Sequence, residues 1–303
     1  MAMLVVILLV FLHVDCSSQL PTKHPSHGVV DMVNEFGPFI GIVMAYQAEA
    51  DAIVSSGEFI PRSDVPWLDL YGITVQTLLN IFDVKGIIHY GTAGSANDTL
   101  SFGDVSVPRF VAFTGSWTWT KFNSEIEELP TLKFGEFNLP EEGKNLLSKV
   151  EFKPEEFYSV GKPMEEVFWL DMGGPWFELA TQLQNLKLQQ CVNKTYCLPE
   201  TPKVVFGLKG STADIFVDNA AYRKFLFNEF KVSTVDEESA AVAMTAMSPG
   251  VPVIVFRGVS DLAGGGSKWS STSLSSLAAA NSLTVALEFI GLIGKDKLLI
   301  SLL

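Results

Sequence analysis

An uninterrupted apolar run near the C-terminal end is the feature that most constrains the fold of this chain. Residues 251–256 read VPVIVF, with no polar residue alternating among them. Such a run is typical of a strand buried on both faces, which requires a largely parallel sheet with helices on each side. Arg257 follows it directly, and Ser260 and Asp261 come shortly after. Because such sheets bind ligands at the carboxyl ends of their strands, we expect chemistry there.

Further carboxylates lie beside other predicted elements. Glu49 follows a second apolar run at residues 39–44, and the acidic triplet at 236–238 opens a small-residue helix over 239–247. Carboxylates near the ends of buried strands form a candidate acid and base set. The alternative, that these acids only cap helices or complement their dipoles, stays open.

The remaining chain alternates strand and helix patterns, which predicts an α/β fold. Strands are predicted at residues 84–94, 104–108 and 204–208, and helices at 74–82, 175–188 and 219–230. The first of these strands runs into Gly91, Thr92, Ala93 and Gly94, which we interpret as a turn whose backbone N–H groups could approach an oxygen-rich ligand. Any tight turn at the end of a strand would give the same pattern. A histidine in the position of His89 is more often a hydrogen-bonded core residue than a catalytic one.

The composition excludes some partners. The formal net charge of −13 argues against binding to a nucleic-acid backbone, because that binding depends on clustered Lys and Arg. The four His residues are scattered, and no metal-ligand cluster is evident. With 303 residues and 48% hydrophobic content, the chain can bury the core of one large domain or two small ones.

The N-terminal segment indicates entry into the secretory pathway. An apolar stretch over residues 3–14, followed by small residues, predicts a cleaved signal at 1–18, with a short membrane anchor as the alternative. We expect a linker at 19–35 and one domain at 36–303, elaborated at about 126–202, where Glu, Lys and Pro accumulate. The protein is then extracellular or vacuolar, without membrane contact after cleavage.

Two further patterns fit that route. Asn97 and Asn193 each begin a glycosylation sequon, although such triplets also occur by chance. Cys191 and Cys197 remain as an even pair once the signal is removed, and we predict a disulfide between them. Two unrelated buried thiols are the alternative.

Several motifs together resemble the nucleoside phosphorylase and methylthioadenosine nucleosidase superfamily. They cover about residues 39–290: GIV at 41–43 with Glu49, GTAG at 91–94, GDV at 103–105, TADIF at 212–216, VDEESAA at 235–241 and RGVSD at 257–261. The secretory start, the insertion and the SDLAGGG ending resemble its plant branch of bark and vegetative storage proteins and cytokinin-riboside phosphorylases. The resemblance implies a single-domain three-layer αβα sandwich with a mixed central sheet.

The resemblance also implies roles for individual residues. Asp261 is the general acid at the purine N7, with Ser260 beside it, Glu238 holds the ribose hydroxyls, and Phe216 and the Val217 backbone contact the base. Glu49 activates water in the nucleosidase branch. Thr92 and Gly94 approach the phosphate or the attacking water. No cofactor is implied beyond phosphate as a possible co-substrate, and relatives are homo-oligomers.

The sequence departs from the family in several places. His89 replaces an Arg of the phosphorylases, and their early Gly-Asp-Pro loop is missing, which weakens phosphate binding. Glu237 stands where relatives commonly have Met. Two strands and a Gly-rich turn that relatives carry after the position of Gly72 are also missing, because Ile73 follows it directly. Losing sheet strands removes core and exposes backbone, so we predict a destabilised and inactive form.

Three hypotheses follow from these observations. The first is an enzyme that cleaves a purine-type nucleoside with phosphate or water. The second is a storage protein that keeps the scaffold as a nitrogen reserve, which the missing segment and Glu237 favour. The third is a module that binds nucleosides without turnover.

Overall fold

A seven-stranded mixed sheet forms the centre of the molecule in a computed structural model that describes residues 27–59, 75–119, 130–133, 149–265 and 272–295. Its strands are β1 (Phe39–Val43), β2 (Val84–Ser95), β3 (Val105–Phe113), β9 (Leu170–Asp171), β10 (Val204–Thr212), β11 (Val232–Asp236) and β12 (Val253–Leu262). Most pairs are parallel, whereas β11 with β2, β12 with β3 and β9 with β3 are antiparallel. The α/β fold predicted from the strand and helix patterns is confirmed, as is the mixed sheet that the resemblance implies.

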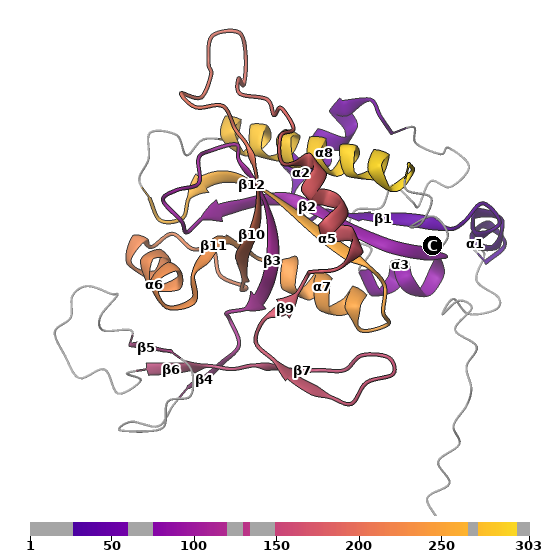
Figure 1. The fold of residues 1–303 in the computed structure, drawn as a ribbon, viewed down its shortest axis with the longest axis horizontal. Helices are drawn as coiled ribbons and strands as arrows, with labels where there is room; N and C mark the ends of the chain where they lie inside the picture. The colour runs from indigo at the N-terminus through magenta and orange to yellow at the C-terminus, as the bar shows by residue number, and fades with distance from the viewer. Residues whose placement is uncertain (1–26, 60–74, 120–129, 134–148, 266–271, 296–303) are drawn as a thin grey trace, which may run out of the picture.

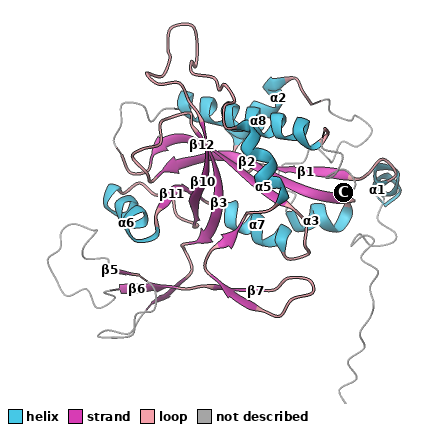
Figure 2. Ribbon diagram, viewed as in Figure 1, coloured by secondary structure: helices cyan, strands magenta, loops and turns pink. Residues whose placement is uncertain are grey.

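Helices cover both faces of this sheet (Figure 1). On one face lie α2 (Gln47–Ser56), α5 (Pro175–Ala180) and α8 (Thr272–Ile293), and on the other lie α1 (His27–Asn34), α3 (Val75–Ile81) and α7 (Ser239–Met247). Adjacent residues of β2 belong to different cores, since Ile88 packs on the first face and Ile87 on the second. The three layers expected from the resemblance are therefore present (Figure 2).

Strand β12 contains the apolar run that opened the sequence analysis, and it lies between two partners. It pairs in parallel with β2, where Arg257 lies opposite Gly91, and in antiparallel with β3. Val253 to Ser260 are all buried. The pairing continues to Leu262, so the strand carries Ser260 and Asp261 itself and presents them at its carboxyl end.

Two local predictions were wrong. Residues 91–94 are not a turn but the last part of β2, because β12 and β11 both pair with this stretch and hold it extended. The helix expected over 175–188 ends early: α5 stops at Ala180, and a 3-10 turn, η2 (Thr181–Leu183), follows.

The boundaries of the linker and the insertion also need correction. The segment assigned to a linker at 19–35 includes α1, whose Val33 packs in the core, so the domain begins before residue 36. The last part of the predicted insertion belongs to the main fold, because β9 joins the central sheet and Trp176 of α5 packs against Phe289.

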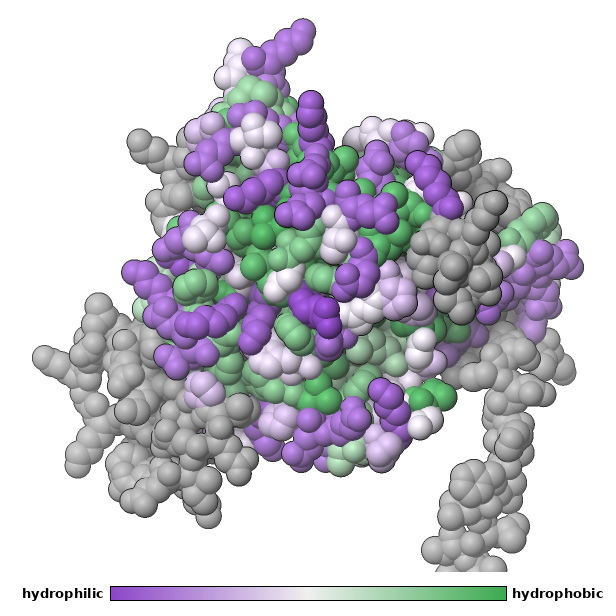
Figure 3. Space-filling model, viewed as in Figure 1, coloured by the Kyte–Doolittle hydropathy of each residue, from purple (hydrophilic) through white to green (hydrophobic). Residues whose placement is uncertain are grey.

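The remaining insertion forms small antiparallel sheets outside the central layers. β4 (Trp117–Trp119), β5 (Thr131–Lys133) and β6 (Lys149–Phe152) make one, and β7 (Glu155–Phe157) with β8 (Glu165–Val167) makes the other. Tyr158 and Val160 are exposed near the tip of the second. Figure 3 shows hydrophilic side chains spread over this face with apolar ones between them, as on ordinary protein surfaces.

Helix α8 is long and apolar enough to cross a membrane by length and composition, and is the one such helix among the described residues. Its apolar side chains are used within the fold. Leu283, Val285 and Phe289 are buried in the core beneath β12 and β2. Packing on the sheet therefore accounts for its composition.

The position of the missing family segment, after Gly72, lies outside the described residues. Among the strands that the structure describes, β1 pairs with β2 alone. The expected loss of stability and activity stays a prediction.

Candidate functional site

A cavity of about 610 Å³ opens at the carboxyl ends of β2, β11 and β12. Nearly all residues that the sequence nominated for the site line it. These are Glu49, Thr92, Gly94, Phe216, Val217, Glu237, Glu238, Ser260 and Asp261. His89 is the exception, since it is fully buried and does not line the cavity.

Glu49 is held at the base of the cavity by the start of α2. Its Oε2 accepts hydrogen bonds from the backbone N–H groups of Ala45 (3.0 Å) and Tyr46 (3.1 Å), and so caps the helix as the alternative reading expected. Its Oε1 accepts from Thr92 N (2.7 Å) and Thr92 Oγ1 (3.2 Å). The Tyr90 hydroxyl also donates to the Glu49 carbonyl (2.6 Å). A structural role and a position in the site thus coincide in one residue.

Arg257 is the residue that sequence reasoning noticed without assigning a role. Its side chain is 1% exposed, and three carboxylates approach it: Glu238 at 2.9 Å, Asp236 at 3.3 Å and Glu49 at 4.0 Å. Its Nε also donates to Ser239 Oγ (2.8 Å). The sequence does indicate such a role, because Arg257 directly follows a wholly apolar strand segment. A charge buried at such a position needs partners of opposite charge.

Asp236, the last residue of β11, and Glu238, the N-cap residue of α7, differ in environment. Burial acts to raise the pKa of Asp236, but Arg257 and the hydrogen bonds from Ser239 and Thr212 hold that pKa below its ordinary value. The pKa of Glu238 is raised, chiefly by burial and further by the neighbouring carboxylates, which outweigh the opposing effect of Arg257. Glu238 is one-third exposed, so one carboxyl oxygen can reach a ligand.

His89 lies behind this cluster. Its Nδ1 is 3.0 Å from the Val43 carbonyl oxygen and its Nε2 contacts Arg257 Nη2. Burial, and then the charge of Arg257, lower the pKa of His89 to about 3. The ring is therefore neutral, with Nδ1–H donating to Val43 and Nε2 accepting from Arg257.

This histidine makes stability depend on pH. Its folded pKa lies below the unfolded value of about 6.5, so between these values the unfolded chain binds more protons and stability falls as pH falls. At pH 5 the loss is about 2 kcal/mol. We expect His89→Asn to remove this contribution, measured by urea unfolding at pH 7.5 and pH 5. An unchanged difference between the two pH values in the variant would contradict the assignment.

Asp261 and Phe216 lie at the open part of the cavity. Asp261 Oδ1 accepts from Ser260 Oγ (2.7 Å), which orients the carboxyl and leaves Oδ2 for a ligand. Phe216 is 76% exposed although it lines the cavity. A large apolar ring at the mouth of a polar cavity is suited to stacking on a flat heterocycle.

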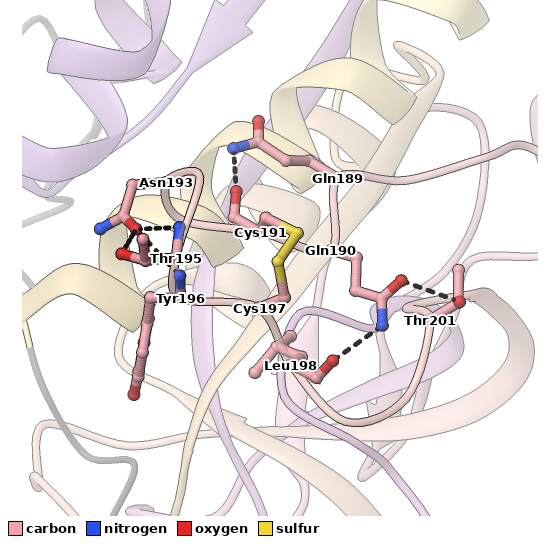
Figure 4. Close-up of a disulfide and its surroundings, with 9 residues drawn as sticks. All are labelled: Gln189, Gln190, Cys191, Asn193, Thr195, Tyr196, Cys197, Leu198 and Thr201. Atoms are coloured by element: carbon pink, nitrogen blue, oxygen red, sulfur yellow. Dashed lines mark hydrogen bonds between the residues drawn. A yellow bond between two sulfur atoms is a disulfide. The ribbon is translucent and has the colours of Figure 1, made fainter.

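The predicted disulfide is present in the described structure, between Cys191 and Cys197 (Figure 4). The six-residue separation encloses the second sequon. Asn193 is exposed in this loop, where its Oδ1 accepts from the backbone N–H and hydroxyl of Thr195 (both 2.9 Å). An exposed loop of this kind can carry a glycan.

The first sequon has a different environment. Asn97 is 9% exposed, its Nδ2 donates to Ser233 Oγ (3.3 Å), and its Oδ1 accepts from Thr99 N and Thr99 Oγ1. A glycan on this nitrogen would displace those contacts, so we expect occupancy at Asn193 and not at Asn97. Peptide mass spectrometry of protein expressed through the secretory pathway of a eukaryotic host checks this, with Asn193→Gln as the control that removes the glycopeptide. A glycopeptide containing Asn97 would contradict it.

Comparison with known proteins agrees with this geometry. The sequence pattern of the phosphorylase superfamily matches residues 70–291. Bark storage proteins A and B from Populus deltoides are each 44% identical over 227 residues, covering 74% of this chain and 71% of theirs.

Solved structures of the same fold come from Helicobacter pylori. A 5′-methylthioadenosine/S-adenosylhomocysteine nucleosidase aligns with TM-score 0.54 and 19% identity, over 83% of this chain and 97% of that one. A futalosine hydrolase mutant aligns with TM-score 0.54 and 18% identity, over 83% and 98%. At sequence identities below 20%, this structural similarity shows a shared fold and nothing more.

Proposed function

Because the chain belongs to the phosphorylase superfamily, we propose that it cleaves the N-glycosidic bond of a purine-type nucleoside. The observation that carries the proposal is the convergence of Asp261, Glu238 and Phe216 on one cavity at the carboxyl ends of the strands. An acid, a sugar-binding carboxylate and an aromatic ring match the three parts of this reaction: the departing base, the ribose and the plane of the purine.

The carboxylates supply the chemistry. Cleavage passes through a cation-like sugar, which negative groups nearby stabilise. Glu238, which Arg257 holds at 2.9 Å, keeps a carboxyl oxygen free to accept from two ribose hydroxyls. Asp261 is placed to act as the general acid that transfers a proton to the purine N7, so that the base departs neutral.

The base is placed by the loop between β10 and α6 (Ala220–Phe230). Phe216 stacks on the ring, and the backbone of the buried Val217 contacts its edge. The Asp218 N–H donates to the Phe216 carbonyl (3.1 Å), and Asn219 caps α6 by accepting from Tyr222 N (2.8 Å). These hydrogen bonds fix the loop at the end where it joins α6.

A storage protein is the second candidate, and the relatives at 44% identity favour it, since they are named bark storage proteins. A disulfide in the surface loop fits a secretory route to the cell exterior or the vacuole, because such bonds persist in oxidising compartments. Loss of turnover with an intact scaffold would distinguish this function from the first.

Release of free base tests the proposal. The full chain is incubated with adenosine and with a cytokinin riboside, and the free base is quantified by chromatography, while circular dichroism confirms a folded sample. We expect base release from at least one nucleoside. Folded protein that releases none supports the storage function instead.

A further inference from the structure

A second cavity, of about 310 Å³, lies at the end of β12 remote from Asp261. It is lined by the end of β9, the start of α5, the end of α7 and the start of β12; α5, α7 and β9 are neighbours in Figure 1. Val253 at this end and Asp261 at the other are about 26 Å apart, at about 3.3 Å per strand residue. We propose that this cavity binds a neutral, mainly apolar molecule of about two fused rings that carries a hydrogen-bond acceptor. The proposal does not depend on nucleoside cleavage.

The cavity forms because β12 and β3 separate at this end of the sheet. The two strands pair where Arg257 lies opposite Ser106. Continued pairing would place Val253 opposite Phe110, but Phe110 pairs with Asp171 of β9 instead. Asp171 and Val253 both line the cavity, which therefore lies between β9 and the start of β12.

A buried donor in the wall of this cavity has no partner. Trp176 is 3% exposed, and its Nε1–H makes no hydrogen bond with any described residue. The six-membered ring of its indole fills the space beside Gly86 in β2 and leaves no room for a Cβ there, and the indole also packs edge-to-face with Phe289. The five-membered ring, which carries Nε1, is thus the part left to face the cavity that Trp176 lines. Because an unpartnered buried donor is unfavourable, an acceptor atom of a ligand would be bound there.

The other lining groups favour a neutral and apolar ligand. Asp171 is the one charged residue in the wall within the described part of the chain, and its Oδ1 already accepts from Arg109 Nε (2.6 Å) and Gly173 N (2.7 Å). A charged ligand would find no free partner to offset the loss of its hydration. Met172 and Met247 supply flexible apolar side chains that can fit an irregular ligand.

The volume sets the size of the ligand. A protein cavity of about 150 Å³ can hold benzene. The cavity beside Trp176 has about twice that volume, so it has room for two fused rings. 1-Indanone is a suitable probe, because this neutral bicyclic ketone has one strong acceptor, and indane has the same two rings without it.

Titration of the full chain with both probes, followed by ligand-observed NMR, tests the proposal. We expect both to bind the native chain. Trp176→Phe removes the N–H and keeps an aromatic ring, so it should weaken 1-indanone by about 2- to 10-fold, the range for one net hydrogen bond, and leave indane unchanged. Trp169→Phe is the matched control, because Trp169 lies against Lys209 outside this cavity and its loss should change neither affinity. Absence of binding, or equal weakening of both probes by Trp176→Phe, would overturn the proposal.

Two further measurements locate the probe. Phe216→Ala alters the other cavity and should leave the affinity for 1-indanone unchanged, whereas a loss of binding would place the probe there and overturn the inference. In the native chain labelled at its methionine methyl groups, 1-indanone should shift the NMR signals of Met172 and Met247 and not that of Met44, whose Sδ accepts from Tyr90 near Glu49. This result needs no variant, so it decides the question even if circular dichroism shows Trp176→Phe to be unfolded. Shifts at Met44 alone would contradict the proposal.

Discussion

Replacing Asp261 by Asn is expected to slow base release by about 10²- to 10⁴-fold, the range over which a positioned general acid accelerates such reactions. The amide keeps the size of the carboxyl and can still contact Ser260, whose hydroxyl lies 2.7 Å from Oδ1 in the native chain. It cannot transfer a proton to the purine N7, so the base would leave as an anion. The change should appear mainly in kcat, because the groups that bind the ribose and the base are untouched.

The matched control is Asp218→Asn. Asp218 also lines the cavity, so this variant removes the same charge from the same space without touching the Ser260 contact. We expect it to retain most of the native rate. Single-turnover measurements on both variants separate chemistry from binding. Equal losses in the two variants would show that cavity charge, and not proton transfer by Asp261, sets the rate.

The fold was predicted where the sequence carries unbroken apolar runs. Residues 39–43 and 253–256 are strands as expected, since such runs are buried whatever their neighbours are. The pattern failed at residues 91–94, where glycines suggested a turn. There the partner strands decide the conformation, and glycine is needed at position 91 because Arg257 and Glu49 leave no room for a side chain.

The residues of the site could be predicted from the resemblance, but the ion pairs and hydrogen bonds among them could not. The family motifs nominated Glu49, Glu238 and Asp261, and all three line one cavity. The ion cluster around Arg257 depends instead on the register between β12 and β2, which sets Arg257 opposite Gly91 and Val255 opposite His89. Register follows from tertiary pairing. No local sequence pattern therefore shows that the His89 ring contacts Arg257 and does not line the cavity.

Removing Arg257 should strongly destabilise the fold. Arg257→Met is expected to lower the free energy of unfolding by about 3 to 5 kcal/mol, because it leaves buried carboxylates without their cation. Asp236 and Glu49 are each only 2% exposed, so water cannot replace the guanidinium. For a chain of this size the melting temperature should fall by about 5 to 8 °C, measured by calorimetry.

Arg109→Met is the control for this prediction. Arg109 Nε lies closer to its partner, 2.6 Å from Asp171 Oδ1, but both side chains are at least one-third exposed. An exposed pair contributes only about 0 to 1 kcal/mol, so burial and not distance should decide the difference between the variants. Combining Arg257→Met with Asp236→Asn should recover part of the loss, because it removes one of the unpaired charges. Equal destabilisation by Arg257→Met and Arg109→Met, or no recovery in the double variant, would show that the buried carboxylates tolerate the loss of their cation.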